Sequence, residues 1–232
     1  MNHRPALIFT CEHAVNHVPS EYRLLLSAKD RAALKSHKGY DAGALDIARP
    51  LARGVSAPLI EGKISRLLVD MNRSESNRRG IFGAIGRRLD ADGKRRLLDK
   101  WRRPFLQKTH EAIQGRLAER GSVILLSIHS FTPVMDGRVR NAEIGLLYDP
   151  SREQERLLAQ HLREKLSQSL PGLRIRMNYP YRGVSDGTAR AMRRAYPGLA
   201  ALELEFNQEM LKSASVRRAL VNQLIHIFTP TG

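Results

Sequence analysis

Apolar runs typical of strands alternate along the chain with longer amphipathic stretches typical of helices. The apolar runs cover residues 6–10, 64–70, 123–129, 144–148, 173–177 and 199–206. The amphipathic stretches cover residues 20–34, 41–52, 90–119, 151–170, 186–196 and 208–228. Strands that alternate with helices predict an α/β fold, in which a mostly buried sheet carries helices on both faces.

The pattern contains no repeat, low-complexity tract or long Gly/Ser linker, so we expect residues 1–232 to form a single domain. A chain of 232 residues with 42% hydrophobic content can bury one substantial core. The most linker-like interval is 80–93, which contains four glycines. We expect this interval to be a mobile loop at the active site.

Cysteine content and the N-terminal segment indicate a compartment. Cys11 is the only cysteine, which excludes an internal disulfide and a cysteine-based zinc site. The segment before the first apolar run is too short for the core of a signal peptide. No apolar stretch approaches the roughly 20 residues that span a bilayer. We therefore expect a cytoplasmic protein without a membrane partner.

The formal net charge of +16 raises the question of a polyanionic partner. The excess is concentrated in residues 73–103, with 11 Lys/Arg against 4 Asp/Glu. Aromatic residues make up only 6% of the chain, and no Gly-rich RNA-binding motif is present. We interpret the charge as a solvated basic face and a field that attracts anionic metabolites. Nucleic-acid binding is the alternative from a different functional class, and we consider it less well supported.

Polar residues follow or end several of the apolar runs. His13 and Asn72-Arg73 come just after two runs, while His129 and Glu205 lie at or near the ends of two others. Ligand sites in α/β sheets gather at the carboxyl ends of strands. Two histidines there suit a divalent metal, and the Asn-Arg pair suits a carboxylate. The set predicts a metal-assisted hydrolase for a small substrate with a free carboxylate.

Several of these residues also have a structural interpretation. Asp41 stands where a helix is predicted to begin, so N-capping competes with a role as an oxygen ligand. Arg66 and Asp70 are spaced to form an ion pair. Glu203 and Glu205 share one face of an otherwise apolar strand. Because an unpartnered buried charge is costly, those two carboxylates need a partner or a function.

Five motifs occur in the order seen in one enzyme family. They are Cys-Glu-His-Ala-Val-Asn-His-Val-Pro at 11–19, Tyr-Asp-Ala-Gly-Ala at 40–44, Ser-Arg-Leu-Leu-Val-Asp-Met-Asn-Arg at 65–73, Ser-Ile-His-Ser-Phe at 127–131 and Glu-Leu-Glu-Phe-Asn-Gln at 203–208. From about residue 8 to 208 the chain resembles the N-formylglutamate amidohydrolases. That family is similar to zinc carboxypeptidases, succinylglutamate desuccinylases and aspartoacylases. The resemblance implies a three-layer α/β/α domain with a mixed, twisted sheet.

The resemblance also implies roles for individual residues. It matches metal ligands to His13 and His129, the carboxylate-binding pair to Asn72 and Arg73, and the general base to Glu205. The wider group has a His-x-x-Glu pair, and Asn16 occupies the place of that glutamate here. The oxygen ligand is then Asp41, within the Tyr-Asp-Ala-Gly-Ala motif, with Glu12 as the alternate.

The implied reaction is the hydrolysis of N-formyl-L-glutamate to formate and L-glutamate, as in the last step of a histidine-degradation route. The implied cofactor is Zn²⁺, or another divalent metal. Arg66 or Arg182 would stabilise the oxyanion, and Arg182 would also be available for a glutamate side chain. The alternatives are another N-acyl amino acid hydrolase and a zinc carboxypeptidase-like peptidase. The oligomeric state is left open.

Overall fold

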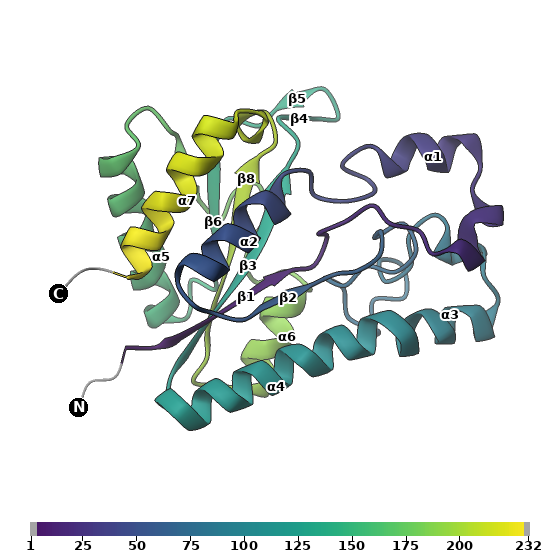
Figure 1. The fold of residues 1–232 in the computed structure, drawn as a ribbon, viewed down its shortest axis with the longest axis horizontal. Coiled ribbons are helices and arrows are strands. Elements are labelled where there is room, and N and C mark those ends of the chain that lie inside the picture. The colour runs from purple at the N-terminus through teal and green to yellow at the C-terminus, as the bar shows by residue number, and fades with distance from the viewer. Residues whose placement is uncertain (1–3, 230–232) are drawn as a thin grey trace.

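A computed structural model describes residues 4–229 of the chain, and its centre is a six-stranded mixed sheet. The strands follow the order β2-β1-β3-β8-β6-β7, and only the contact between β6 and β8 is antiparallel. A separate hairpin of β4 and β5 follows β3 (Figure 1). The strands are β1 (Ala6–Cys11), β2 (Leu59–Glu61), β3 (Val123–Phe131), β4 (Val134–Met135), β5 (Arg138–Val139), β6 (Ile144–Leu147), β7 (Ile175–Met177) and β8 (Ala200–Asn207).

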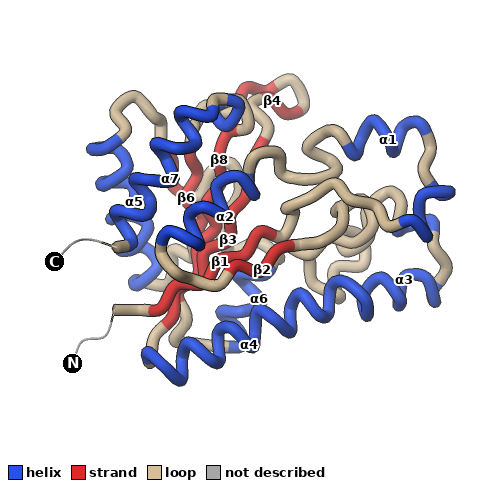
Figure 2. Tube along the Cα trace, viewed as in Figure 1, coloured by secondary structure: helices blue, strands red, loops and turns tan. Residues whose placement is uncertain are grey.

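Helices cover both faces of this sheet, so the predicted three-layer α/β architecture is confirmed (Figure 2). One layer contains α2, α5 and α7, and the other contains α4 and α6. Among the described residues, no helix is both long enough and apolar enough to cross a membrane. The helices are α1 (Ala28–Leu34), α2 (Ala44–Gly54), α3 (Ala91–Leu97), α4 (Arg103–Arg120), α5 (Glu153–Ser169), α6 (Thr188–Ala195) and α7 (Ala214–Phe228).

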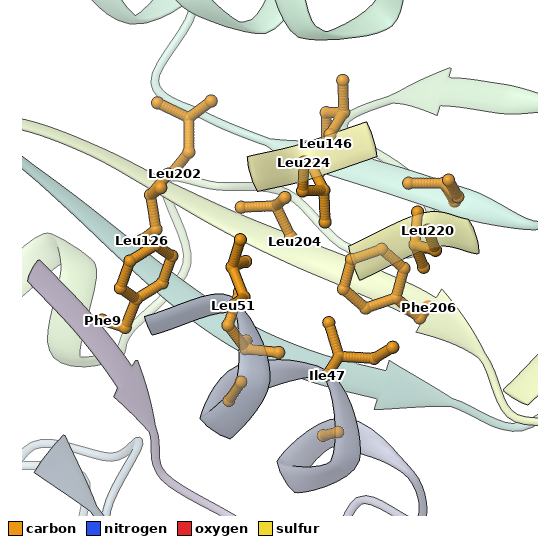
Figure 3. Close-up of a cluster of buried hydrophobic side chains, with 14 of the residues drawn as sticks. Phe9, Ile47, Leu51, Leu126, Leu146, Leu202, Leu204, Phe206, Leu220 and Leu224 are labelled. Carbon is orange, nitrogen blue, oxygen red and sulfur yellow. The ribbon is translucent and has the colours of Figure 1, made fainter. Parts of the chain in front are cut away.

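The two faces of the sheet bury two separate apolar clusters. Leu202, Leu204 and Phe206 of β8 point into the first cluster, against α2 and α7 (Figure 3). Ala201 of β8 belongs to the second cluster, on the side of α4 and α6. Since side chains alternate along a strand, Glu203 and Glu205 share the second face with Ala201. The second face therefore changes from apolar to acidic toward the carboxyl end of β8.

The predicted strand at 64–70 is wrong. This segment has turn conformation, and its one ladder-type contact is an isolated bridge between Val69 and Phe82. Its apolar side chains are nevertheless buried, because they pack into the second cluster from outside the sheet. The sheet gains β2 instead, whose three residues are too few for periodicity to reveal.

The interval 80–93 is not a loop of the active site. Ile81 and Ile85 are buried in the second cluster. Gly86 approaches the main chain so closely that a Cβ would lie 1.9 Å from Leu68 O. The structure describes every residue of this interval, and none of them lines the cavity beyond the carboxyl ends of β1, β3 and β8. Its glycines allow it to pack beneath the 64–70 segment.

Two predicted helices are interrupted. The stretch 20–34 divides into a 3₁₀ helix, Ser20–Leu25, and α1, which begins at a capping box between Ser27 and Asp30. The stretch 90–119 contains a π-helical segment, Leu98–Arg102, between α3 and α4. Such segments shift the direction of the side chains that follow them.

A buried ion pair fixes the start of β8 against α5 and α6. Glu155 is fully buried, and its Oε1 accepts hydrogen bonds from Arg193 Nε at 2.8 Å and from Ala201 N at 3.1 Å. Arg193 also donates to the carbonyls of Gly183 and Ala201. The pair thereby sets the position of the strand that carries the two acidic residues.

Replacing Glu155 with Ala should lower the free energy of unfolding by about 3–5 kcal/mol, because the charge of Arg193 would remain buried without its partner. Glu153→Ala is the matched control, since Glu153 lies on the same helix in an exposed pair with Arg156. That change should cost less than about 1 kcal/mol. Urea titration measures both, and equal losses would contradict the anchoring role of Glu155.

Candidate active site

A cavity of about 440 Å³ lies beyond the carboxyl ends of β1, β3 and β8. His13 follows the end of β1, and His129 lies near the end of β3. His129 is paired in register with Glu205 on the neighbouring strand β8. With the exception of the alternate ligand Glu12, every site residue expected from the sequence lines this cavity: His13, Asp41, Arg66, Asn72, Arg73, His129, Arg182 and Glu205.

Two imidazoles and one carboxylate converge at the base of the cavity. His13 Nδ1 lies 3.3 Å from Asp41 Oδ2, and His129 Nδ1 lies 2.9 Å from the same oxygen. One ligand atom from each residue lies within 4.8 Å of the others, and all three residues are buried. Imidazole nitrogen and carboxylate oxygen are a common ligand set for catalytic zinc. The three residues could therefore hold a metal ion.

Asp41 is free for this position because it does not cap a helix. Helix α2 begins at Ala44, and its N-cap is Gly43 with a left-handed φ of 81°. The Asp41 main-chain N–H donates to His13 O at 3.0 Å, which ties the loop of Asp41 to the end of β1. The capping interpretation of Asp41 is therefore wrong, and its carboxylate faces the histidines.

A second carboxylate lies behind each imidazole. His13 Nε2 is 2.7 Å from Asp70 Oδ1, and His129 Nε2 is 3.2 Å from Glu12 Oε2. Carboxylates in this position orient metal-binding histidines and raise their basicity. Because each Nε2 atom faces one of these carboxylates, the Nδ1 atoms of both rings face Asp41 Oδ2. Glu12 stands outside the converging group, so Asp41 supplies its oxygen atom.

The charge balance at this point favours a cation. Arg66 pairs with Asp41 at 3.3 Å and with Asp70 at 3.0 Å, which confirms the expected Arg66–Asp70 pair. Burial alone would raise the pKa values of Asp41 and Asp70, but His13 and Arg66 hold both well below the ordinary range. Burial would lower the pKa of His129, yet its carboxylate partners raise it well above the usual value. Three carboxylates, Asp41, Asp70 and Glu12, thus face Arg66 and two imidazoles whose pKa values they raise. A metal cation bound to neutral imidazoles would replace the protons of those rings as the positive charge opposite the carboxylates.

The Asn72-Arg73 pair lies in a loop rather than at the end of a strand. Asn72 Oδ1 accepts a hydrogen bond from Thr188 N at 2.7 Å, at the start of α6. Arg73 Nη1 donates to the carbonyls of Asn72 and Asp186, both at 2.8 Å. Arg102 is buried in the π-helical segment, and its Nε donates to Arg73 O at 2.8 Å. Sequence reasoning missed Asp186 and Arg102, because only the tertiary fold brings them to this loop.

The two glutamates of β8 differ in their surroundings. Burial raises the pKa of Glu205 to about 7, with a further contribution from Asp41. Glu205 Oε2 is buried and has no hydrogen-bond partner among residues 4–229. Burial also raises the pKa of Glu203, but Asn72 hydrogen-bonds to that carboxyl and lowers it in part. Glu205 therefore lines the cavity and has one buried carboxyl oxygen without a partner.

Convergent imidazole and carboxylate groups beside an unpartnered buried carboxyl are typical of metal-assisted hydrolases. A comparison with family models matches residues 5–211 to N-formylglutamate amidohydrolase. The chain therefore belongs to the N-formylglutamate amidohydrolase family, a family of amide-hydrolysing enzymes.

Solved structures share this fold over nearly the whole chain. The gene product Atu2144 from Agrobacterium tumefaciens is similar with a TM-score of 0.81 and 29% identity, over 97% of this chain and 90% of that one. N-formylglutamate amidohydrolase from Ralstonia eutropha JMP134 has a TM-score of 0.75 and 16% identity, over 97% and 94% of the two chains. A comparison with curated proteins finds no match.

The carboxylate behind His13 provides a direct test of the site. Asp70→Asn should weaken the binding of Zn²⁺ by roughly 10- to 100-fold, because the amide orients the ring less firmly and donates less electron density to it. Competition with a chromogenic chelator measures the affinity. Asp46→Asn is the control, because Asp46 is an exposed residue of α2 outside the cavity, and this variant should bind as the wild type does. Equal affinity in Asp70→Asn and the wild type would exclude a supporting role for Asp70.

Proposed function

We propose that the protein hydrolyses N-formyl-L-glutamate to formate and L-glutamate, using a zinc ion bound by His13, Asp41 and His129. The proposal is carried by Glu205, which lines the same cavity as the convergent residues and has one buried carboxyl oxygen without a hydrogen-bond partner among residues 4–229. Membership of the N-formylglutamate amidohydrolase family supports the choice of substrate.

The cations of the cavity support an anionic substrate. Lys38, Arg73, Arg140 and Arg182 line the cavity, and none forms an ion pair within residues 4–229. Arg66, by contrast, is engaged by Asp41 and Asp70. A substrate with two carboxylates would find unpaired positive charge on several parts of the wall. This feature also accounts for part of the basic composition without a polyanionic partner.

We assign Glu205 as the general base. When bound, a zinc ion supplies Lewis acidity, which polarises a carbonyl and makes a water molecule more acidic. A carboxyl with a pKa near 7 is well matched to accept the proton of that water at neutral pH and to deliver it to the departing amine. Glu203 is the weaker candidate, because Asn72 already hydrogen-bonds to it.

Asn72 and Arg73 are assigned to the α-carboxylate of the substrate. Arg73 Nη1 is fixed to two carbonyl oxygens, so the remaining N–H groups of the guanidinium have a defined direction. A charge-assisted contact of this kind both binds a carboxylate and orients the scissile amide. Arg66 bridges the two aspartates and lines the cavity, where it would face negative charge that develops on the carbonyl oxygen.

Formate release tests the proposed reaction. Zinc-loaded protein should release formate from N-formyl-L-glutamate, and treatment with a chelator should abolish the release until zinc is restored. N-acetyl-L-glutamate and a short peptide with a free C-terminus are tested in parallel, with the newly released amino group as the readout common to all three substrates. If one of those is the better substrate, the enzyme is a different N-acyl amino acid hydrolase or a peptidase. If wild-type activity survives complete removal of metal, the metal-dependent mechanism is wrong.

A pair of matched substitutions on β8 tests the choice of base. Glu205→Gln should reduce kcat by on the order of 10²- to 10⁴-fold and leave the metal content unchanged, because an amide cannot accept the proton. Glu203→Gln should lose much less activity. Steady-state kinetics with metal analysis distinguishes the two residues, and the reverse order of effects would assign the base to Glu203.

A further inference from the structure

Arg140 lines the cavity with a guanidinium that is fixed against aromatic rings. Its Cζ lies 5.0 Å from the ring centre of Tyr181 and 5.9 Å from that of Phe131. Its Nη2 donates to the Tyr181 hydroxyl at 3.1 Å and also contacts Met135 Sδ. Phe131 is the last residue of β3, two positions after His129. The stack is thus attached to the strand that carries one of the convergent imidazoles.

The main chain that carries Arg140 is held in place as well. Arg140 N donates to Pro133 O at 2.7 Å, which closes the segment containing the β4–β5 hairpin. The next residue, Asn141, donates its N–H to the Tyr179 hydroxyl at 2.9 Å. A long side chain that is already ordered loses little conformational entropy when a ligand binds. Arg140 is therefore preorganised on the cavity wall.

The positive charge of Arg140 has no carboxylate partner in the described part of the chain. Its Nε and Nη1 atoms also have no hydrogen-bond acceptor within residues 4–229. Stacking occupies the flat face of a guanidinium and leaves the N–H groups along its edge available. An ordered cation with free donors on the wall of a cavity suits the carboxylate of a ligand.

We propose that Arg140 binds the side-chain carboxylate of the N-acyl amino acid and thereby selects acidic over neutral side chains. This inference rests on the proposed function, since it assigns the second carboxylate of the same substrate. Arg73 is assigned to the α-carboxylate, so a dicarboxylate needs another cation. Arg182, the candidate from the sequence, also lines the cavity, but it is exposed and its side chain has no hydrogen bond, ion pair or ring contact within residues 4–229. Ordering Arg182 would cost more conformational entropy than using Arg140.

Binding of L-glutamate and L-glutamine to zinc-loaded protein, measured by calorimetry, tests Arg140 without reference to turnover. The two ligands have nearly the same size and differ in the charge of the side chain. Wild type should prefer glutamate by on the order of 10- to 100-fold, the range expected for one charge-assisted hydrogen-bonded contact. Arg140→Ala should bind the two ligands with similar affinity. Arg140→Gln should do the same, and it retains most of the side-chain volume if the alanine variant folds poorly.

Arg138→Ala is the matched control, because Arg138 is an exposed arginine of the same hairpin that does not line the cavity. It should keep the preference for glutamate, as should Arg182→Ala. Arg140→Lys should keep only part of the preference, since an ammonium lacks the planar fork and stacks less well. A wild-type protein without a preference, or an Arg140→Ala variant with the full preference, would overturn the proposal. If the protein prefers glutamate through Arg140 but releases no formate, the proposed reaction is wrong and the role of Arg140 stands.

Discussion

The site depends on a single oxygen atom, Asp41 Oδ2, which faces the Nδ1 atoms of both His13 and His129. The other oxygen of Asp41 pairs with Arg66, which in turn holds Asp70 behind His13. These ion pairs connect three segments of the chain: the loop after β1, the end of β3 and the segment before Asn72. Because these groups are buried, each contact is strong and each unpaired charge would be costly. A bound metal cation would take the place of the protons on the two imidazoles.

The sheet explains why this constellation can exist inside an apolar protein. The second face of the central strands is covered by α4 and α6 near their starts, where Val123 and Leu125 are buried. Farther along the same face, the alternation of side chains presents His129 on β3 and Glu205 on β8. One face thus serves as core at one end and as the wall of the cavity at the other. The opposite face of β8 stays apolar to Phe206 and packs against α2 and α7 (Figure 3).

Periodicity and strand-end chemistry were sufficient to predict the layers, most strands and the convergence of His13 with His129. They failed for residues 64–70, because a segment can be buried without pairing as a strand. The apolar side chains of this segment pack into the second cluster, while its backbone has turn conformation. Partners that depend on the tertiary fold were also beyond the sequence. Arg102 reaches the Asn72-Arg73 loop from a π-helical segment, and Arg140 reaches the cavity from a short hairpin. Neither geometry has a periodic signature.

In the proposed metal site, the two Nδ1 atoms and the Asp41 carboxylate bind one ion, with a carboxylate behind each imidazole. A crystal structure of zinc-loaded protein, with anomalous data collected on both sides of the zinc absorption edge, tests it most directly. We expect one strong anomalous peak within bonding distance of Nδ1 of His13, Nδ1 of His129 and an oxygen of Asp41, with Asp70 and Glu12 outside the ligand set. A peak elsewhere, ligation through an Nε2 atom, or no peak at saturating zinc would show that these three residues do not form the metal site.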